Sequence, residues 1–287
     1  MLDFHIYDVF TDRPFSGNPL AVVTGADGLS TAQMQVIARQ FNLSETIFVQ
    51  SPRDPAHTAR VRIFLPKAEI PFAGHPTIGC ALHLSGGENG RIVLEEQAGL
   101  VPVTIADGLA EFVAPALPAL TGEAPTPVDV AAALGLAVGQ IGFGAHRPAM
   151  ASAGNDFIFV PLRDLEALAQ ARPRGEAFEA LTRAAPKLYA YAPEGDGFRA
   201  RMFAPANGVP EDPATGSASA TLPALLLAAG RLGEGENRIA LRQGVEMGRP
   251  SEIGLTVQVG NGAITEVRIS GRAAKVAEGR ITIPEVH

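Results

Sequence analysis

The sequence predicts an α+β protein of two similar lobes, each a curved and mostly antiparallel sheet around a central helix. Three observations support this fold class. Short runs of apolar or alternating residues, bounded by turn residues, recur along the chain and are typical of strands. Each half also contains an apolar helical segment that opens with small residues. Finally, the two halves repeat each other in sequence, which indicates an internal duplication.

The repeat is clearest just before and within the two small-residue segments. Residues 60–81 and 199–220 align without gaps, and the equivalent residues Arg62 and Arg201 are 139 positions apart. The identical positions are Arg60/Arg199, Arg62/Arg201, Phe64/Phe203, Pro66/Pro205, Pro71/Pro210 and Ala81/Ala220. So many identities in one ungapped stretch indicate common descent of the two halves rather than shared composition.

A second, weaker match supports the same division of the chain. Residues 16–23 resemble residues 153–160, in the same order and at nearly the same offset. A Pro/Ala-rich stretch at 114–129 separates the halves. We therefore predict an N-terminal lobe at 1–120 and a C-terminal lobe at 121–287, with the active site in a cleft between them, where ligands commonly bind.

The expected elements of the N-terminal half follow in order. Strands are predicted at 4–11, 19–25, 45–50, 59–65, 91–97 and 100–106. Apolar residues at helical spacing predict a helix over 29–42 with Ser30 as its N-cap. The small and apolar residues of 75–84 predict the central helix of this lobe.

The C-terminal half repeats this plan. One long helix is predicted over 216–230, and antiparallel strands are predicted at 236–244, 254–260 and 263–270.

Composition excludes several classes of function. The 23 basic and 30 acidic residues give a net charge of −7, with no basic cluster, so we expect neither nucleic acid nor an acidic membrane as a partner. The single cysteine, Cys80, allows no disulfide within the chain and fits a reducing cytoplasm. No signal-like N-terminus or 18-residue apolar run is seen. We expect a soluble, cytoplasmic protein.

Small residues at the predicted helix N-termini indicate a place where a ligand can approach the backbone. A helix N-terminus exposes unpaired N–H groups and a partial positive charge, which favours anions. Gly74 in the first half, and Thr215, Gly216 and Ser217 in the second, are small enough to permit such contact. The alternative is an ordinary tight loop with good capping residues.

Titratable side chains lie beside these helix starts. They are His75 in the first half and Glu211 and Asp212 in the second. Glu45 enters an apolar strand, and partial desolvation there would raise its pKa and suit it to proton transfer. The alternative for Glu45 is a solvated loop acid. Scattered histidines and the lack of a close His/Asp/Glu set argue against a metal site.

Four motifs carry a family resemblance over essentially the whole chain. "DVFTDRPFSGNPLAVV", "NLSETIFV", "FAGHPTIG" and "EDPATGSA" resemble, in order and spacing, the phenazine-biosynthesis (PhzF-like) isomerases, which have a diaminopimelate-epimerase-like fold. The resemblance implies that Glu45 shuttles a proton between carbons and that His75 contacts substrate. It also implies that Asp212, Gly216 and Ser217 belong to a loop that anchors the ligand, and that the protein is a homodimer.

The residues and the resemblance together predict a cofactor-independent isomerase of a small carboxylated metabolite, with Glu45, His75 and Asp212 in catalysis. A two-thiol racemase is excluded because the chain has one cysteine. Asn18, in the Gly-Asn-Pro turn, is a further candidate for substrate binding, and its alternative is a conformational role in the turn. A lyase or epimerase, or a ligand sensor without turnover, remains an alternative. Two lobes joined by a Pro/Ala-rich seam also suggest closure on ligand.

Overall fold

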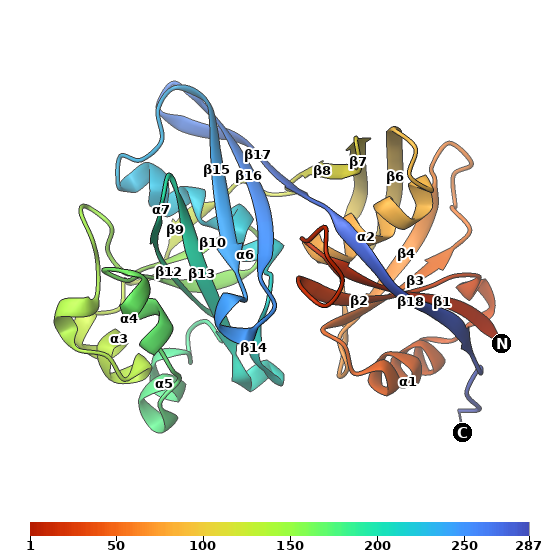
Figure 1. The fold of residues 1–287 in the computed structure, drawn as a ribbon, viewed down its shortest axis with the longest axis horizontal. Coiled ribbons are helices and arrows are strands. Elements are labelled where there is room, and N and C mark those ends of the chain that lie inside the picture. The colour runs from red at the N-terminus through yellow and green to blue at the C-terminus, as the bar shows by residue number, and fades with distance from the viewer. Residues whose placement is uncertain (287) are drawn as a thin grey trace. The chain divides into compact units, whose positions relative to one another are not determined.

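The computed structural model describes residues 1–286 and divides the chain into two compact units. Unit 1 contains residues 1–113 together with the segment from Ser270 onward, and unit 2 contains Ala114–Ile269. Figure 1 shows that each unit combines a twisted sheet with a few helices.

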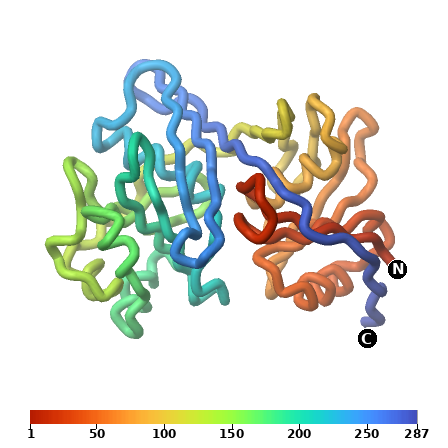
Figure 2. The backbone as a smooth tube through the Cα atoms, in the orientation of Figure 1, coloured from red at the N-terminus to blue at the C-terminus, as the bar shows by residue number. Residues whose placement is uncertain are grey.

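The segment after Ser270 corrects the predicted domain boundaries. We assigned everything after residue 120 to the C-terminal lobe, but β18 (Ala273–Ile281) pairs antiparallel with β1 (Leu2–Val9) along its whole length. Figure 2 shows this blue segment running beside the red start of the chain. The repeat alone could not predict that β18 joins the sheet of unit 1, because the matching segments end well before β18.

The elements of unit 1 follow the predicted order. Its other strands are β2 (Asn18–Val23), β3 (Glu45–Gln50), β4 (Ala59–Phe64), β5 (Glu69–Ile70), β6 (Gly90–Glu96), β7 (Gly99–Ala106) and β8 (Leu109–Val113). Its α-helices are α1 (Thr31–Phe41) and α2 (Gly74–Ser85). The strands and both helices predicted for this half are confirmed to within a few residues at their ends.

Unit 2 has more helices than the sequence predicted. Its strands are β9 (Ala119–Thr121), β10 (Ala149–Ser152), β11 (Asp156–Pro161), β12 (Leu188–Glu194), β13 (Gly197–Ala204), β14 (Val209–Asp212), β15 (Gly235–Gln243), β16 (Ser251–Gly260) and most of β17 (Ala263–Gly271). Its α-helices are α3 (Pro127–Leu134), α4 (Leu165–Gln170), α5 (Gly175–Leu181), α6 (Gly216–Thr221) and α7 (Pro223–Ala228). Short 3₁₀ helices in the two units are Ala26–Gly28, Val138–Gln140, Pro205–Asn207 and Val245–Met247.

The predicted duplication is confirmed by strand pairing. In unit 1, β2–β3 and β4–β6 are parallel, whereas β1–β2, β3–β4 and β6–β7 are antiparallel. In unit 2, β11–β12 and β13–β15 are parallel, whereas β10–β11, β12–β13 and β15–β16 are antiparallel. The order of parallel and antiparallel steps is the same. The strand that pairs with the first of each series is β18 in unit 1 and β9 in unit 2.

Helix α2 lies at the centre of unit 1, in contact with strands on several sides. Its small residues allow this close packing. A Cβ atom added at Gly79 would lie 2.6 Å from Leu20 Cδ2 and 2.8 Å from Val9 Cγ2. Glycine at this position therefore lets the helix approach β1 and β2, and substitution would force them apart.

Helix α1 covers another part of the unit 1 sheet and begins as predicted. The Ser30 hydroxyl accepts from the Gln33 backbone N–H, and the Gln33 side chain accepts from the Ser30 N–H, which forms a capping box. Met34 and Ile37 are buried in a cluster with apolar strand residues. The helix ends at Asn42, which has a left-handed backbone with φ of 51°.

The single long helix predicted over 216–230 is instead two short helices, α6 and α7. The break falls at Leu222 and Pro223, the N-cap and first residue of α7. Because proline has no N–H and its ring crowds the preceding turn, it interrupts the hydrogen-bond ladder of a continuous helix. The outer helices α3, α4 and α5 bury apolar residues against the unit 2 strands. Among residues 1–286, no helix combines the length and apolar character needed to cross a membrane.

Candidate functional site

Glu45 is the first residue of β3, as the sequence predicted. The chain leaves α1 through Asn42 and enters β3, where Glu45 lies opposite Leu20 of the parallel strand β2. The Glu45 side chain is 14% exposed, so its carboxylate is largely shielded from bulk water while still reachable. The next residues, Thr46 and Ile47, are buried and fix the start of the strand.

His75 lies against Glu45. It is the second residue of α2 and is 4% exposed, with its Nε2 atom 3.3 Å from Glu45 Oε2. Burial lowers the pKa of His75 to about 3, and a hydrogen bond with the Pro19 backbone only partly opposes this effect. The imidazole is therefore neutral at ordinary pH, so its contact with Glu45 is not an ion pair.

Asn18 completes this group. It is fully buried at the start of β2, and its Nδ2 atom lies 3.5 Å from His75 Nδ1. The preceding turn is tightly fixed: Gly17 has φ of +64°, and a Cβ atom there would lie 2.3 Å from the Val9 carbonyl oxygen. The Phe15 N–H donates to Asp8 at 2.6 Å. The turn therefore holds the Asn18 amide against the histidine, whichever role it has with a ligand.

Gly74 provides the N-terminal end of α2 beside this group. It is the first helical residue and is buried, and the N-cap residue, Ala73, has no side chain that could cap the helix. Pro76, the third residue, has no N–H to satisfy. The backbone N–H groups of the first turn therefore have no side-chain cap, and such groups can attract an anion.

The predicted residues of unit 2 form a separate hydrogen-bonded group. Asp212, at the end of β14, is 8% exposed and accepts from Thr215 Oγ1 at 2.6 Å. The Gln243 amide donates to the Asp212 carbonyl at 2.7 Å and to Thr215 Oγ1 at 2.9 Å. The Gln243 carbonyl oxygen accepts from the Thr215 N–H at 3.1 Å. One buried glutamine therefore secures the whole turn that begins α6.

Gly216 and Ser217 are the first two residues of α6, with Thr215 as N-cap. Gly216 is buried and Ser217 is half-buried. The Ser217 carbonyl accepts from the Thr221 hydroxyl at 2.8 Å, as expected inside a helix. Their positions at the helix start match the sequence expectation.

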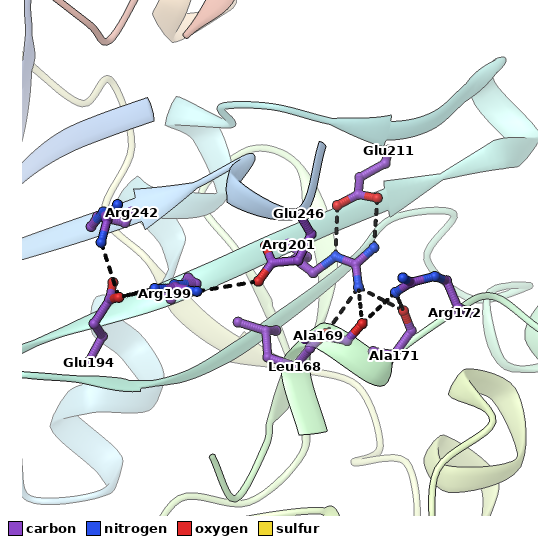
Figure 3. A network of polar contacts seen from close by, with 10 residues as sticks. All are labelled: Leu168, Ala169, Ala171, Arg172, Glu194, Arg199, Arg201, Glu211, Arg242 and Glu246. Atoms are coloured by element: carbon purple, nitrogen blue, oxygen red, sulfur yellow. Dashed lines mark hydrogen bonds and ion pairs between the residues drawn. The ribbon is translucent and has the colours of Figure 1, made fainter. Parts of the chain in front are cut away.

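Glu211, the other acid predicted at this helix start, is part of a structural ion pair (Figure 3). Arg201 is 3% exposed and donates through Nε and Nη2 to the two carboxylate oxygens, each at 2.8 Å. Its Nη1 atom donates to the carbonyls of Leu168 and Ala171 at the end of α4. Glu211 therefore anchors β14 to the unit 2 core, whereas Asp212 is bonded within the turn that begins α6.

The sequence analysis did not identify two buried polar residues near these groups, Glu96 and Gln243. Glu96 ends β6 and Gln243 ends β15, and each lies beside the helix that follows its repeat loop. Strand alternation contained the signal. Glu96 is two residues after buried Leu94, and Gln243 is two residues after buried Leu241, so each shares the inward face.

The arrangement in unit 1 suits proton transfer by oxygen and nitrogen groups. A carboxylate next to a buried neutral imidazole can accept and return a proton while the imidazole holds its orientation. Cys80 takes no part in such chemistry, because it is fully buried within α2 and burial raises the pKa of its thiol. Residues 1–286 contain no cluster of three His, Cys, Asp or Glu side chains suited to a metal ion.

Comparison with known proteins gives matches over nearly the whole chain. The family model described as phenazine biosynthesis-like protein (PhzC-PhzF) matches residues 7–279. An uncharacterized isomerase of Mesorhizobium japonicum is 42% identical over 98% of this chain and 99% of its own length. The trans-2,3-dihydro-3-hydroxyanthranilate isomerase of Pseudomonas aeruginosa is 38% identical over 96% and 97%, respectively. A crystal structure of a Bacillus anthracis protein of the PhzF family superposes with a TM-score of 0.88 at 25% identity, covering 98% of this chain and 99% of that one.

Proposed function

The chain belongs to the phenazine biosynthesis-like (PhzC-PhzF) family and is an isomerase, and we propose that Glu45 carries the proton that it moves. In this proposal, a small carboxylated metabolite loses a proton from one carbon to Glu45 and regains it from Glu45 at another carbon. No cofactor takes part. The observation that carries the proposal is the 3.3 Å separation between Glu45 Oε2 and Nε2 of a buried histidine.

The surroundings of Glu45 support its role as a proton carrier. A neutral His75 contributes no positive charge that would hold Glu45 permanently ionised. In this proposal the carboxylate accepts the proton and gives it back within one turnover. His75 and Asn18 orient it, and the Gly74 end of α2 stabilises negative charge that develops on the substrate during deprotonation.

We assign substrate anchoring in unit 2 to Asp212, Thr215, Gly216 and Ser217. The Thr215 N–H is already bonded to Gln243, whereas Gly216 and Ser217 begin the helix and present their N–H groups at its start. These groups suit a substrate carboxylate. The buried Asp212 carboxylate suits a substrate hydroxyl or ammonium group.

The first substrate to test is the one named for the relatives. The Pseudomonas aeruginosa relative is named for isomerisation of trans-2,3-dihydro-3-hydroxyanthranilate. That compound combines a carboxylate with a conjugated ring, in which a proton can leave one carbon and return to another. Both features fit the chemistry proposed for Glu45 and for the helix N-termini.

Carbon-bound deuterium uptake tests the proposal directly. The protein is incubated in heavy water with trans-2,3-dihydro-3-hydroxyanthranilate, and separately with a pool of small carboxylic acids, and mass shifts are followed over time. Glu45→Gln keeps the shape of the side chain but cannot carry the proton. Glu88→Gln, at an exposed glutamate of the same unit, is the matched control.

We expect the unmodified protein and Glu88→Gln to label the same compound, and Glu45→Gln to leave it unlabelled. Equal labelling by Glu45→Gln would remove Glu45 from the centre of the mechanism. Thermal stabilisation by an acid that no variant labels or converts would instead indicate ligand binding without turnover.

A further inference from the structure

We propose that Glu96 is a positioning residue for this site: as a neutral carboxylic acid it donates a hydrogen bond to Thr77 and so fixes the first turn of α2, which carries His75. The proposal rests on the function proposed for Glu45 and His75. Glu96 is the last residue of β6 and is not among the residues proposed to contact substrate.

The contacts of Glu96 place it against the first turn of α2, which carries His75. Its side chain is buried, and its Oε1 atom lies 2.6 Å from Oγ1 of Thr77, two residues after His75 in α2. Its Oε2 atom is also buried and has no hydrogen-bond partner within the described part of the chain, residues 1–286. An ionised carboxylate with one oxygen left bare in this way would be costly to bury.

A count of protons at Thr77 indicates which form of Glu96 is present. The Thr77 hydroxyl has one proton, yet its oxygen lies 2.8 Å from the Ala73 carbonyl and 2.6 Å from Glu96 Oε1. A carbonyl supplies no proton, so Thr77 must donate to Ala73 if that contact is a hydrogen bond. The second contact then needs a proton from Glu96. Only the neutral acid satisfies both.

The duplicated unit contains an independent counterpart. Arg60 lies opposite Glu95 across β4–β6, and its repeat equivalent, Arg199, lies opposite Arg242 across β13–β15. The next residues along the strands are Glu96 and Gln243, which are therefore equivalent. Gln243 donates to Thr215 at the start of α6. Glutamine has the shape of protonated glutamate and carries no charge, so unit 2 fills the same place with a permanently neutral donor.

The electrostatic surroundings agree with a neutral Glu96. Burial raises the pKa of Glu96 to about 8, and the contact with Thr77 opposes this shift only in part. The Cys80 thiol is a titratable group that interacts with Glu96. Burial raises the pKa of this thiol, and Glu96 raises it further. On the neighbouring strands, Gly99 of β7 lies opposite Glu96, and the Arg60 of β4 lies opposite Glu95 instead.

Fixing this turn matters because it carries His75 and has no side-chain cap of its own at Ala73. The hydrogen-bonded chain from Glu96 through Thr77 to the Ala73 carbonyl ties the first turn of α2 to the end of β6 and so holds His75 in place. His75 in turn stands 3.3 Å from Glu45. A shift of the turn by even 1 Å would separate the two groups, which typically costs about 100-fold in rate.

Two substitutions at one position test the proposal. Glu96→Gln keeps a neutral donor of the same shape and should retain kcat within about threefold. Glu96→Leu removes the donor and should lower kcat at least tenfold while changing KM little, because substrate contacts are untouched. The assay uses trans-2,3-dihydro-3-hydroxyanthranilate. Equal loss of kcat in both variants would overturn the proposal, as would full activity of Glu96→Leu.

The pH dependence of unfolding tests the protonation state without any assay of activity. Since the pKa of Glu96 is raised in the folded protein, its stabilising contribution is complete below about pH 4.5 and is lost as pH rises through about 8. The urea midpoint of the unmodified protein should therefore fall relative to that of Glu96→Gln between these values. Parallel midpoints would show that Glu96 is ionised and would overturn its assignment as donor. A protein that turns over no substrate but shows this relative fall would contradict the proposed function alone.

Discussion

The two units use the same device to hold the loop before their small-residue helix. Arg62 donates to both carboxylate oxygens of Glu69 at 2.7 and 2.6 Å, and Arg201 does the same to Glu211. Each guanidinium also lies over a phenylalanine two residues later, Phe64 or Phe203. In this scaffold, the arginine and the phenylalanine are at equivalent positions of the repeat, whereas the glutamates are three positions out of step.

The chemistry beside that scaffold differs between the units. In unit 1, Leu20 lies opposite Glu45; in unit 2, continuing the β11–β12 register by one residue puts Lys187 in the equivalent place. Lys187 donates to Asn155, which the repeat matches to Asn18. The proposed proton carrier is therefore absent from unit 2, where a cation occupies its position. Both units therefore keep the arginine and phenylalanine of the scaffold, whereas only unit 1 has the acid and the imidazole.

The largest effect should come from removing the proton carrier. We expect Glu45→Gln to lower kcat by about 10²–10⁴-fold, the usual contribution of a positioned acid or base. Lys187→Met, at the equivalent place in unit 2, should leave kcat within about twofold. Steady-state kinetics of both variants measure this contrast. A comparable loss in Lys187→Met would mean that the chemistry is shared by the two copies.

Breaking the shared scaffold should affect the two units unequally. Arg201 is 3% exposed and Arg62 is 18% exposed, and their carboxylate partners Glu211 and Glu69 are 17% and 25% exposed, so the carboxylate left behind is less well solvated in unit 2. We expect Arg201→Met to lower the free energy of unfolding by about 3–5 kcal/mol and Arg62→Met by about 1–2 kcal/mol. Urea denaturation, with hydrogen exchange to locate the change, measures both.

A double substitution checks the reason for this inequality. Arg201→Met combined with Glu211→Leu removes the half-buried carboxylate that would be left unpaired and should recover most of the lost stability. Failure to recover would indicate that the bonds of Arg201 to the α4 carbonyls, rather than the carboxylate left behind, account for the loss.

Lowering the pH should destabilise α2 because it protonates His75, which has no histidine counterpart in unit 2. The pKa of His75 is about 3 in the folded protein, below its ordinary value of 6.5. Stability that depends on the neutral imidazole is therefore present above about pH 6.5 and is lost as pH falls toward 3. Between pH 7 and pH 5 the expected loss is about 1–2 kcal/mol.

Hydrogen exchange of the α2 amides at several pH values follows this loss, with His75→Gln as the comparison. The substituted protein should show a flatter dependence on pH over this range. An equally steep response in both proteins would assign the acid sensitivity to other groups.

The smallest effect concerns the helix break that distinguishes unit 2. Pro223→Ala supplies the missing N–H and lets α6 and α7 join, which would make this helix more like the unbroken α2. We expect slower exchange of the amides around position 223 and a change of less than about 1 kcal/mol in the free energy of unfolding. Unchanged exchange would show that Leu222, rather than Pro223, sets the break.

Local patterns in the sequence were sufficient for much of the fold. The spacing of Met34, Ile37 and Phe41 predicted α1, and Ser30 was correctly placed as its cap. The repeat around Arg62 and Arg201 predicted two related units, and both arginines pair with a glutamate of the following strand, although Glu69 and Glu211 are not at equivalent positions of the repeat. Helices α3, α4 and α5 were missed, since each is short and takes its stability from packing against strands distant in sequence.

The candidate site was predicted in its residues and not in its contacts. Local sequence context and motif resemblance selected Glu45 and His75, and the Gly-Asn-Pro turn selected Asn18, but nothing in their spacing gives the distances between them. Glu96 was missed because its partner, Thr77, is 19 residues away and on a different kind of element. The pairing of β18 with β1 was beyond reach for the same reason, since it joins segments more than 260 positions apart.

That pairing sets an order of events during synthesis on the ribosome. Unit 2 is one continuous stretch, Ala114–Ile269, so all of its strands and helices can come together before β18 has been made. Unit 1 begins earlier but lacks the strand beside β1 until residues 273–281 have emerged. The unit that holds Glu45 and His75 is therefore the last to be finished. A chain that stops translation just before residue 273 would contain all of unit 2 but would lack the strand that pairs with β1 in the unit of these two residues.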